Sequence, residues 1–176
     1  TVAEAAHCEL IDFYTPLHNH PELLHDNVHP HIWGSQIMAQ VAYSAITGDY
    51  GGLQLAECYS DGMVLPRNRQ LTLDGVANVK DEITVSIAGQ QHKATTGLDG
   101  KWSVKLNPLK TGGPYTLSVK TQNQKIEIKD IWAGEVWLCS GQSNMAFSLR
   151  ECSTGEEDIP KASNSQIRIL NYQWLS

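Results

Sequence analysis

Residues 53–130 carry the feature that most constrains the fold, a series of short segments in which apolar and polar side chains alternate. Successive side chains of a β-strand point to opposite faces, so alternation of this kind predicts strands with one buried face. The segments lie at residues 71–73, 83–87, 102–106, 115–119 and 126–128. Turn signals between them are Asp74-Gly75, Ala88-Gly89, Asp99-Gly100 and the Gly-containing run 110–114. Short strands at regular spacing predict an all-β sandwich, and Asp99-Gly100 is the strongest hairpin signal.

The first 52 residues have a different character. They hold six of the seven histidines, and from Ser35 their apolar side chains recur at helical spacing. This spacing predicts a helix over residues 35–47 with one buried face, begun by Gly34-Ser35 and ended by Gly48 in a left-handed conformation. Upstream, residues 8–14 have the apolar character of a short buried strand that leads into a polar, His-rich loop.

Residues 131–176 return to the pattern of an α/β protein. Residues 134–139 predict a buried strand, residues 140–144 a sharp turn, and Met145 the start of a helix. A second strand is predicted at residues 166–170, which gives the order of a parallel βαβ unit. These shifts in composition divide the chain into three expected domains, at residues 1–52, 53–130 and 131–176.

Charge and hydropathy argue against two classes of function. The 176 residues contain 13 Lys+Arg and 19 Asp+Glu, a formal net charge of −6, without a cluster of basic side chains. Because nucleic-acid binding normally requires a basic surface, no nucleic-acid partner is expected. No apolar run approaches the ~20 residues of a spanning helix, so no membrane span is expected either. Four cysteines, at positions 8, 58, 139 and 152, allow three two-disulfide pairings and do not choose among them.

Ser143 is the candidate nucleophile. It lies at the predicted turn from strand to helix, where a hydroxyl stands clear of the backbone and helix amides point at a developing oxyanion. The second glycine of G-x-S-x-G is missing, so the nucleophile elbow of the α/β-hydrolases is not supported. The alternative interpretation is that Ser143 only caps the helix, as serine often does.

Asp26 and His29 form a second group of candidates. A carboxylate three residues before an imidazole can accept from one ring nitrogen and fix the tautomer, while the other nitrogen faces a serine hydroxyl. The same spacing also occurs by chance between surface residues without a catalytic role. The neighbouring histidines match neither a zinc-finger pattern nor H-E-x-x-H, so no metal site is expected.

Longer stretches of sequence resemble a known family. Residues 130–145, DIWAGEVWLCSGQSNM, resemble the nucleophile region of the sialate O-acetylesterase family, within the SGNH-hydrolase superfamily. Residues 59–67, YSDGMVLPR, resemble the opening of that family's N-terminal β-domain. Residues 24–30, LHDNVHP, followed by a helix that ends at Gly48, resemble the closing motif of an SGNH hydrolase, where the aspartate and histidine of the triad reside.

The resemblance implies a fold and an order of modules. Residues 1–50 are similar to the C-terminal end of an SGNH esterase domain, and residues 53–176 to the β-domain and nucleophile region of a sialate O-acetylesterase. The implied fold class is mixed, with flavodoxin-like α/β pieces of an SGNH hydrolase on either side of an all-β sandwich. In the superfamily the serine opens the domain and the Asp/His pair closes it, whereas here the pair comes first. We therefore expect Ser143 and His29 to serve different sites on a chain that joins two modules; the alternative is that another polypeptide supplies missing strands and the two ends meet.

The resemblance also implies chemistry. Ser143 becomes the nucleophile, with its amide in the oxyanion hole, His29 the general base and Asp26 its orienting partner; Gln142 and Asn144 are candidate substrate contacts. The implied function is a carbohydrate O-acetylesterase that removes acetyl esters from sialic acid or related glycans with no cofactor and no metal. Its expected partners are an acetylated glycan and the remainder of the esterase domain, from the same or another polypeptide. The expected location is secreted, periplasmic or lysosomal, with no export signal in these residues. The alternative function is a non-catalytic carbohydrate-binding or scaffolding fragment of a larger esterase.

Overall fold

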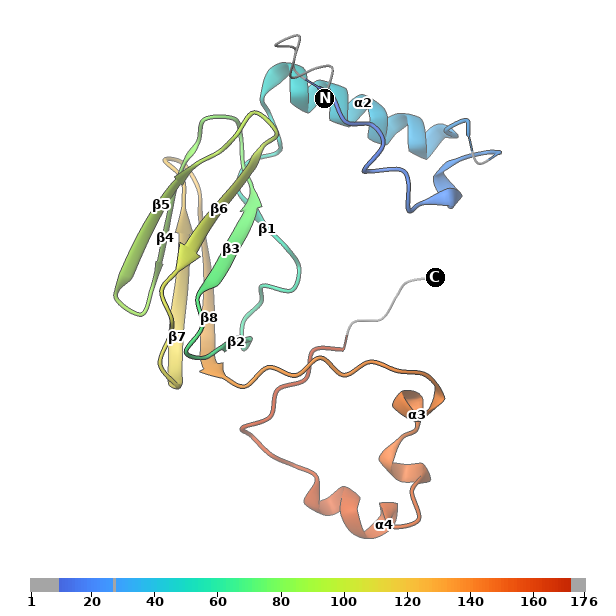
Figure 1. Cartoon of the computed structure of the whole chain (residues 1–176), viewed down its shortest axis with the longest axis vertical. Helices are drawn as coiled ribbons and strands as arrows, with labels where there is room; N and C mark the ends of the chain where they lie inside the picture. Colours follow the sequence, from blue (N-terminus) through green and yellow to red (C-terminus); the bar gives the residue numbers. More distant parts are fainter. Residues whose placement is uncertain (1–9, 27, 172–176) are drawn as a thin grey trace.

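The computed structural model describes residues 10–26 and 28–171. Its helical elements are η1 (Pro21–Leu23), α2 (Ile32–Thr47), α3 (Ser143–Ala146), η2 (Leu149–Glu151), α4 (Gly155–Asp158) and η3 (Ile159–Lys161). Its strands are β1 (Gln54–Leu55), β2 (Val64–Pro66), β3 (Leu71–Val76), β4 (Glu82–Ile87), β5 (Gln90–Thr95), β6 (Lys101–Leu106), β7 (Gly112–Lys120) and β8 (Lys125–Gly134). Figure 1 shows the strands gathered together, with α2 at one end of the molecule and α3 and α4 at the other.

The strands form two sheets around one hydrophobic core. One sheet has the order β1-β3-β6 and the other the order β2-β8-β7-β4-β5. Inward-facing side chains alternate with exposed ones, as along β6, where every second residue is buried. The core takes Leu73, Trp102, Val104 and Leu106 from the first sheet, and Ile83, Val85, Ile87, Leu117, Val119, Ile128, Ile131 and Ala133 from the second. We call residues 54–134 the β region, and it holds most of the regular structure of the described chain.

All five predicted strand segments lie within observed strands, namely β3, β4, β6, β7 and β8. The structure adds β1, β2 and β5, which the alternation of apolar residues does not single out. Of these, β5 is an edge strand with the sequence QQHKAT, and none of its residues is fully buried. A tight turn at Ala88-Gly89, with φ of 50° and 77°, joins it to β4.

The hairpin predicted at Asp99-Gly100 is wrong in its pairing. A turn is present, since the amide of Gly100 donates to the carbonyl of Gly97 at 3.1 Å and Gly100 has a φ of 72°. However, it joins β5 to β6, which belong to different sheets. The chain uses the turn to cross from one sheet to the other and bring Trp102 into the core.

The two strands predicted after the β region are also wrong. Within residues 134–139 only Gly134 belongs to a strand, as the last residue of β8, and residues 166–170 form no strand. Trp137 and Leu138 are 82% and 95% exposed. The predicted helix is a single turn, α3. A buried strand requires hydrogen-bonding neighbours, and the described chain places no strand beside residues 135–139 or 166–170. The α/β arrangement expected for this part is therefore not formed in the structure.

Helix α2 covers the helix predicted at residues 35–47 but begins three residues earlier, at Ile32, with His31 as its N-cap. Gly48 ends it in the left-handed conformation, with a φ of 75°, as predicted. The predicted buried face is wrong, because only Gly34 and Ser44 are buried and Ile46 is exposed. Of the strand predicted at residues 8–14, the first two residues lie outside the described part and the rest is not a strand. None of the described helices is long and apolar enough to cross a membrane.

Candidate functional site

Asp26 and His29 lie in the turn between η1 and α2. Oδ2 of Asp26 is 2.7 Å from Nδ1 of His29, and Oδ1 accepts from the backbone amides of His29 at 2.7 Å and Val28 at 3.2 Å. These hydrogen bonds, first the one from the His29 amide and then the one from its ring, hold the pKa of Asp26 below its usual value. The carboxylate therefore orients the imidazole through Nδ1. The side chain of His29 is 77% exposed, so its Nε2 faces solvent.

Backbone hydrogen bonds fix this turn against α2. The amide of His25 donates to the carbonyl of His29 at 2.7 Å, and the amide of His31 donates to the carbonyl of Leu23 at 3.1 Å. The ring of His31 accepts from the amide of Trp33 at 3.0 Å and contacts the carbonyl of Glu22 through Nε2. The His-rich segment is thus organised by local contacts at the start of the helix.

The other histidines of this segment also have local contacts. His20 pairs with Glu22 at 2.7 Å, and the ring of His18 stacks on Tyr14 with centroids 4.7 Å apart. In the described residues no group of three or more His, Cys, Asp or Glu side chains could hold a metal ion. The three described cysteines, Cys58, Cys139 and Cys152, are free thiols.

Ser143 is the first residue of α3 and is exposed, as are its neighbours Gln142 and Asn144. The N-cap is Gln142, whose backbone carbonyl accepts from the amide of Met145 at 2.9 Å. The interpretation of Ser143 as a helix cap is therefore wrong. The strand predicted before it is not formed either, because residues 135–140 belong to no strand and are exposed. Its hydroxyl is open to solvent at a one-turn helix.

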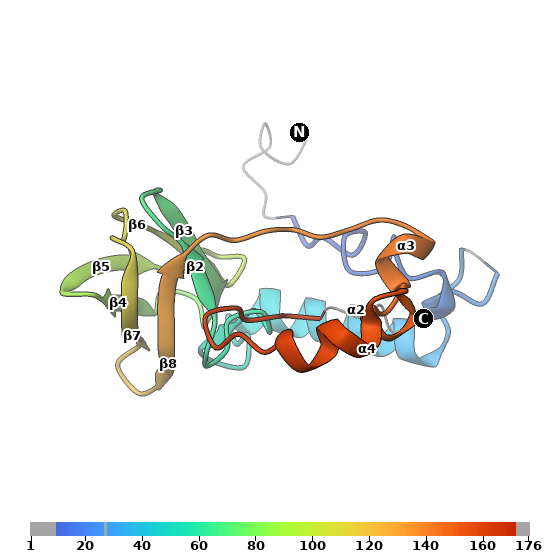
Figure 2. The ribbon, with the colours of Figure 1, turned by 90° about the horizontal axis from the view of Figure 1, so that it is seen from below.

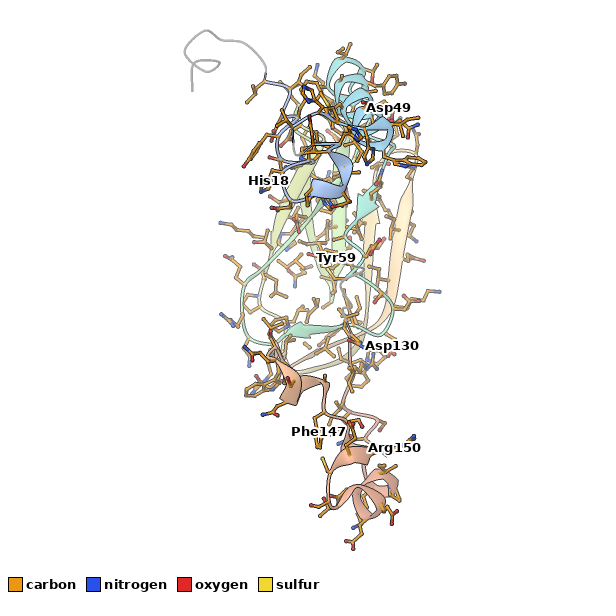
Figure 3. The ribbon with its side chains drawn as sticks, turned by 90° about the vertical axis from the view of Figure 1, so that its right-hand side faces the viewer. His18, Asp49, Tyr59, Asp130, Phe147 and Arg150 are labelled. Atoms are coloured by element: carbon orange, nitrogen blue, oxygen red, sulfur yellow. The ribbon has the colours of Figure 1, made fainter. Side chains whose placement is uncertain are left out.

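The structure does not bring Ser143 to the Asp26–His29 pair. Figure 1 places α2 and the preceding His-rich segment at one end of the molecule and α3 at the other. Figure 3 agrees, with His18 at the top of the view and Phe147, which follows α3, toward the bottom. Among the described residues, the serine, the imidazole and the carboxylate do not form one triad.

The sequence does not reveal how the residues that precede Ser143 are held to the β region. Strand β2 runs parallel to β8, with Val64 opposite Trp132, so residues 64–66 lie beside residues 132–134. The amide of Trp132 donates to the carbonyl of Met63 at 3.1 Å. Oδ1 of Asp61 accepts from the amide of Lys129 at 2.6 Å. These contacts join residues 68 or 69 positions apart, and no local pattern indicates such pairings.

A polar cleft lies between the linker that follows α2 and the loops at one end of the β region. Its volume is about 370 Å³, and it has no apolar side chain in its lining. Besides two glycines, it is lined by Asp49, Asn78, Asp81, Thr121, Asn123 and Gln124. Oδ1 of Asn78 and Oε1 of Gln124 accept from linker amides, at 2.8 Å from Tyr50 and 2.6 Å from Leu53. The sequence gives no signal for this cleft, because its residues come from three separate loops.

Comparison with known proteins places the chain beside esterases. No model of a protein family matches it. It is 28% identical over 132 residues to sialate O-acetylesterase of Rattus norvegicus, covering 68% of this chain and 24% of that protein. It is 35% identical over 75 residues to sialate O-acetylesterase of Homo sapiens, covering 40% of this chain and 14% of that protein.

A solved structure is also similar. A carbohydrate acetylesterase from Xanthomonas citri matches with a TM-score of 0.61 and 31% identity, over 65% of this chain and 26% of that one. The chain thus spans about a quarter or less of the length of these proteins. Sequence and structural similarity agree with the resemblance to the sialate O-acetylesterase family. Over the part that it shares with these longer proteins, the chain is sialate O-acetylesterase-like.

Proposed function

We propose that this chain carries the nucleophile-bearing part of a carbohydrate O-acetylesterase, whose substrates are acetyl esters of sialic acid or related glycans. The observation that carries the proposal is the similarity to sialate O-acetylesterases and to a carbohydrate acetylesterase. The exposed Ser143, at the first turn of α3, supplies a hydroxyl that an ester can reach. Gln142 and Asn144, exposed on either side, are the proposed substrate contacts.

The reaction is acyl transfer to water. Oγ of Ser143 attacks the acetyl carbonyl carbon while an imidazole accepts the hydroxyl proton, and the Ser143 amide donates to the oxyanion that forms. The sugar oxygen leaves with the proton that the imidazole returns, and the acetyl group stays on the serine. Water, deprotonated by the same imidazole, then releases acetate and restores the hydroxyl. No step requires a cofactor.

We assign Asp26 and His29 the roles of orienting carboxylate and general base, in a site other than that of Ser143. The 2.7 Å contact between Oδ2 and Nδ1 supports these roles, since it leaves Nε2 able to take a proton from a serine hydroxyl. The distance between the two ends of the molecule supports the separation (Figure 1). On this proposal the chain joins two modules, with the limits 1–52, 53–130 and 131–176, the middle one being an all-β sandwich.

The remainder of the esterase domain, from the same or another polypeptide, is the proposed partner of residues 135–170. Exposed apolar side chains at Val136, Trp137, Leu138, Ile167 and Ile169 support it, because strands of an α/β sheet would bury them. We further propose that the enzyme is exported, to a secreted, periplasmic or lysosomal location where acetylated glycans occur.

Replacement of the nucleophile tests the proposal in a longer esterase that contains this sequence. Ser143→Ala should abolish acetate release from an acetylated sugar and labelling by a fluorophosphonate. Ser140→Ala is the matched control, because it removes an exposed hydroxyl three residues away, and it should leave both unchanged. His29→Ala should leave labelling at Ser143 intact if the two groups serve different sites. Undiminished turnover by Ser143→Ala would refute the assignment of the nucleophile.

A non-catalytic carbohydrate-binding role is the second candidate, and the polar cleft favours it. Carboxylates and amides such as Asp81 and Asn123 can hydrogen-bond the hydroxyl groups of a sugar. Titration of the 176-residue chain with neutral and sialylated oligosaccharides, followed by calorimetry, tests this role. Binding that Asp81→Ala abolishes, without fluorophosphonate labelling, would favour the binding module over the esterase.

A further inference from the structure

We propose that two arginines, Arg67 and Arg168, fasten both ends of the Ser143-bearing segment to the β2–β8 edge of the β region and thereby position the nucleophile. This inference rests on the proposed function, in which Ser143 attacks the ester. The segment comprises residues 135–167, and Figure 2 shows its course from the end of β8 out to α3, with the later residues returning toward the sheets.

Arg168 holds the C-terminal end of the segment to the β region. Its Nη1 donates to the carbonyls of Gly62 and Asp130, both at 2.7 Å, and lies 3.0 Å from Oδ2 of Asp130. The guanidinium carbon is 5.8 Å from the ring centroid of Trp132, within the range of a cation–π contact. With 28% of its side chain exposed, Arg168 is the most buried member of the described ion pairs. Residues 166–170 are otherwise exposed, so this side chain holds them to the sheet.

The acceptor groups that bind Arg168 are positioned by the backbone and hydrogen bonds of the β region. Asp130 has a φ of 56°, a left-handed conformation that costs a residue other than glycine on the order of 1 kcal/mol. Its Oδ1 accepts from Nε1 of Trp132 at 2.9 Å. The amide of Gly62 donates to the carbonyl of Lys129 at 3.0 Å, which holds the two acceptor loops together. Two carbonyls and a carboxylate thus converge on the position that the guanidinium occupies.

Arg67 holds the N-terminal end of the segment to the β region. Its amide donates to the carbonyl of Gly134 at 3.0 Å, at the last residue of β8. Its Nε and Nη2 lie 2.7 Å and 2.6 Å from Oε1 of Glu135, the first residue of the segment. Because β2 and β8 are neighbours in one sheet, both ends of the segment are held at the same edge of that sheet.

Holding both ends of the segment to the sheet also restricts the position of Ser143. Tying the two ends reduces the range of positions available to the residues between them, which lowers the entropy lost when the nucleophile is ordered. Small displacements of a nucleophile can reduce turnover about 100-fold. Arg67 and Arg168 do not touch the reacting atoms, so they are positioning residues, and their loss should lower kcat while KM stays unchanged.

The first experiment uses the 176-residue chain and does not depend on activity. The indole N–H resonance of Trp132, identified by its loss in Trp132→Phe, reports on the Asp130 carboxylate that Arg168 contacts. Arg168→Ala should shift this resonance. Lys125→Ala, which breaks the Lys125–Glu127 ion pair on the same strand, is the matched control and should not shift it. An unchanged Trp132 resonance in Arg168→Ala would overturn the proposal.

The second experiment uses a longer esterase that contains this sequence. Arg168→Ala should lower kcat at least 10-fold with KM and the urea midpoint unchanged, and Arg168→Lys should recover part of the loss, since an ammonium can pair with Asp130 but cannot form the fork of a guanidinium. Lys125→Ala should match the parent. A kcat for Arg168→Ala equal to that of the parent would overturn the positioning role, even with the Trp132 shift present. Full activity of Ser143→Ala would instead overturn the proposed function, and the Trp132 resonance would still decide the contact.

Discussion

Two isoleucines separated by 38 positions should differ strongly in how much the same substitution destabilises the chain. Ile131, on β8, is 0% exposed and belongs to the shared core, whereas Ile169 is 87% exposed. Truncation of a buried isoleucine to alanine costs about 2–5 kcal/mol, through lost burial and the cavity left behind. Truncation at an exposed position stays within about 0.5 kcal/mol. We therefore expect Ile131→Ala to cost about 3 kcal/mol of unfolding free energy and Ile169→Ala close to none.

Urea unfolding of the 176-residue chain, followed by tryptophan fluorescence to which the buried Trp102 contributes, measures the difference. With a slope of about 1–3 kcal/mol per molar urea, a loss of about 3 kcal/mol lowers the midpoint by about 1–3 M. For a cooperative unit of about 80 residues, the same loss lowers Tm by about 12–24 °C. An equal loss of stability in Ile169→Ala would refute the reasoning, because it would mean that residues 166–170 pack into the core. In a longer esterase, where the proposed partner strands cover Ile169, the substitution should become costly.

Three further outcomes are expected. Gly100→Ala should destabilise the chain by about 1–3 kcal/mol in urea unfolding, because Gly100 has a φ of 72° and a Cβ there would overlap the ring of Tyr50. The pKa of Asp26 is lowered, so the hydrogen bond from the His29 amide to its carboxylate is fully present above the ordinary carboxyl pKa of about 3.9. This hydrogen bond is lost as pH falls through the lowered pKa. The amide resonance of His29 should follow this titration, and Asp26→Asn should remove the pH dependence. Burial, with the neighbouring carboxylate of Asp74, raises the pKa of Tyr59 to about 12. The stability that its neutral phenol contributes is therefore complete below about pH 10 and is lost as pH rises through about 12. A titration of tyrosinate absorbance should show one late-titrating group that Tyr59→Phe removes, and its persistence in that variant would contradict the assignment.

The β region could be predicted from the sequence because its signal is local. Residues 83–87 alternate strictly, and the structure buries Ile83, Val85 and Ile87 on one face of β4. The left-handed Gly48 at the end of α2 is equally local, since it depends on one residue and the helix before it. In contrast, strand β5 has no apolar alternation, because an edge strand can be held by backbone hydrogen bonds to one neighbour.

The predictions around Ser143 failed for a different reason. Residues 134–139 and 166–170 have the composition of buried strands, but a strand forms only where another strand offers hydrogen bonds. The sequence pattern reports this preference and cannot report whether the neighbours are present. The Asp26–His29 contact, three residues apart, could be anticipated from spacing, whereas the contacts of Arg168 with Gly62 and Asp130 span 106 and 38 positions and have no local signature.

The parallel pairing of β2 with β8 has an evolutionary consequence. It sets the points where residues 135–167 depart and rejoin within one narrow strip of sheet, so the length of polypeptide between them is not dictated by the strands. For a flexible loop, each doubling of length costs only about 0.6 kcal/mol of closure entropy. A sheet of this kind can therefore accept insertions of very different length at this junction during evolution, without any change in its hydrophobic core.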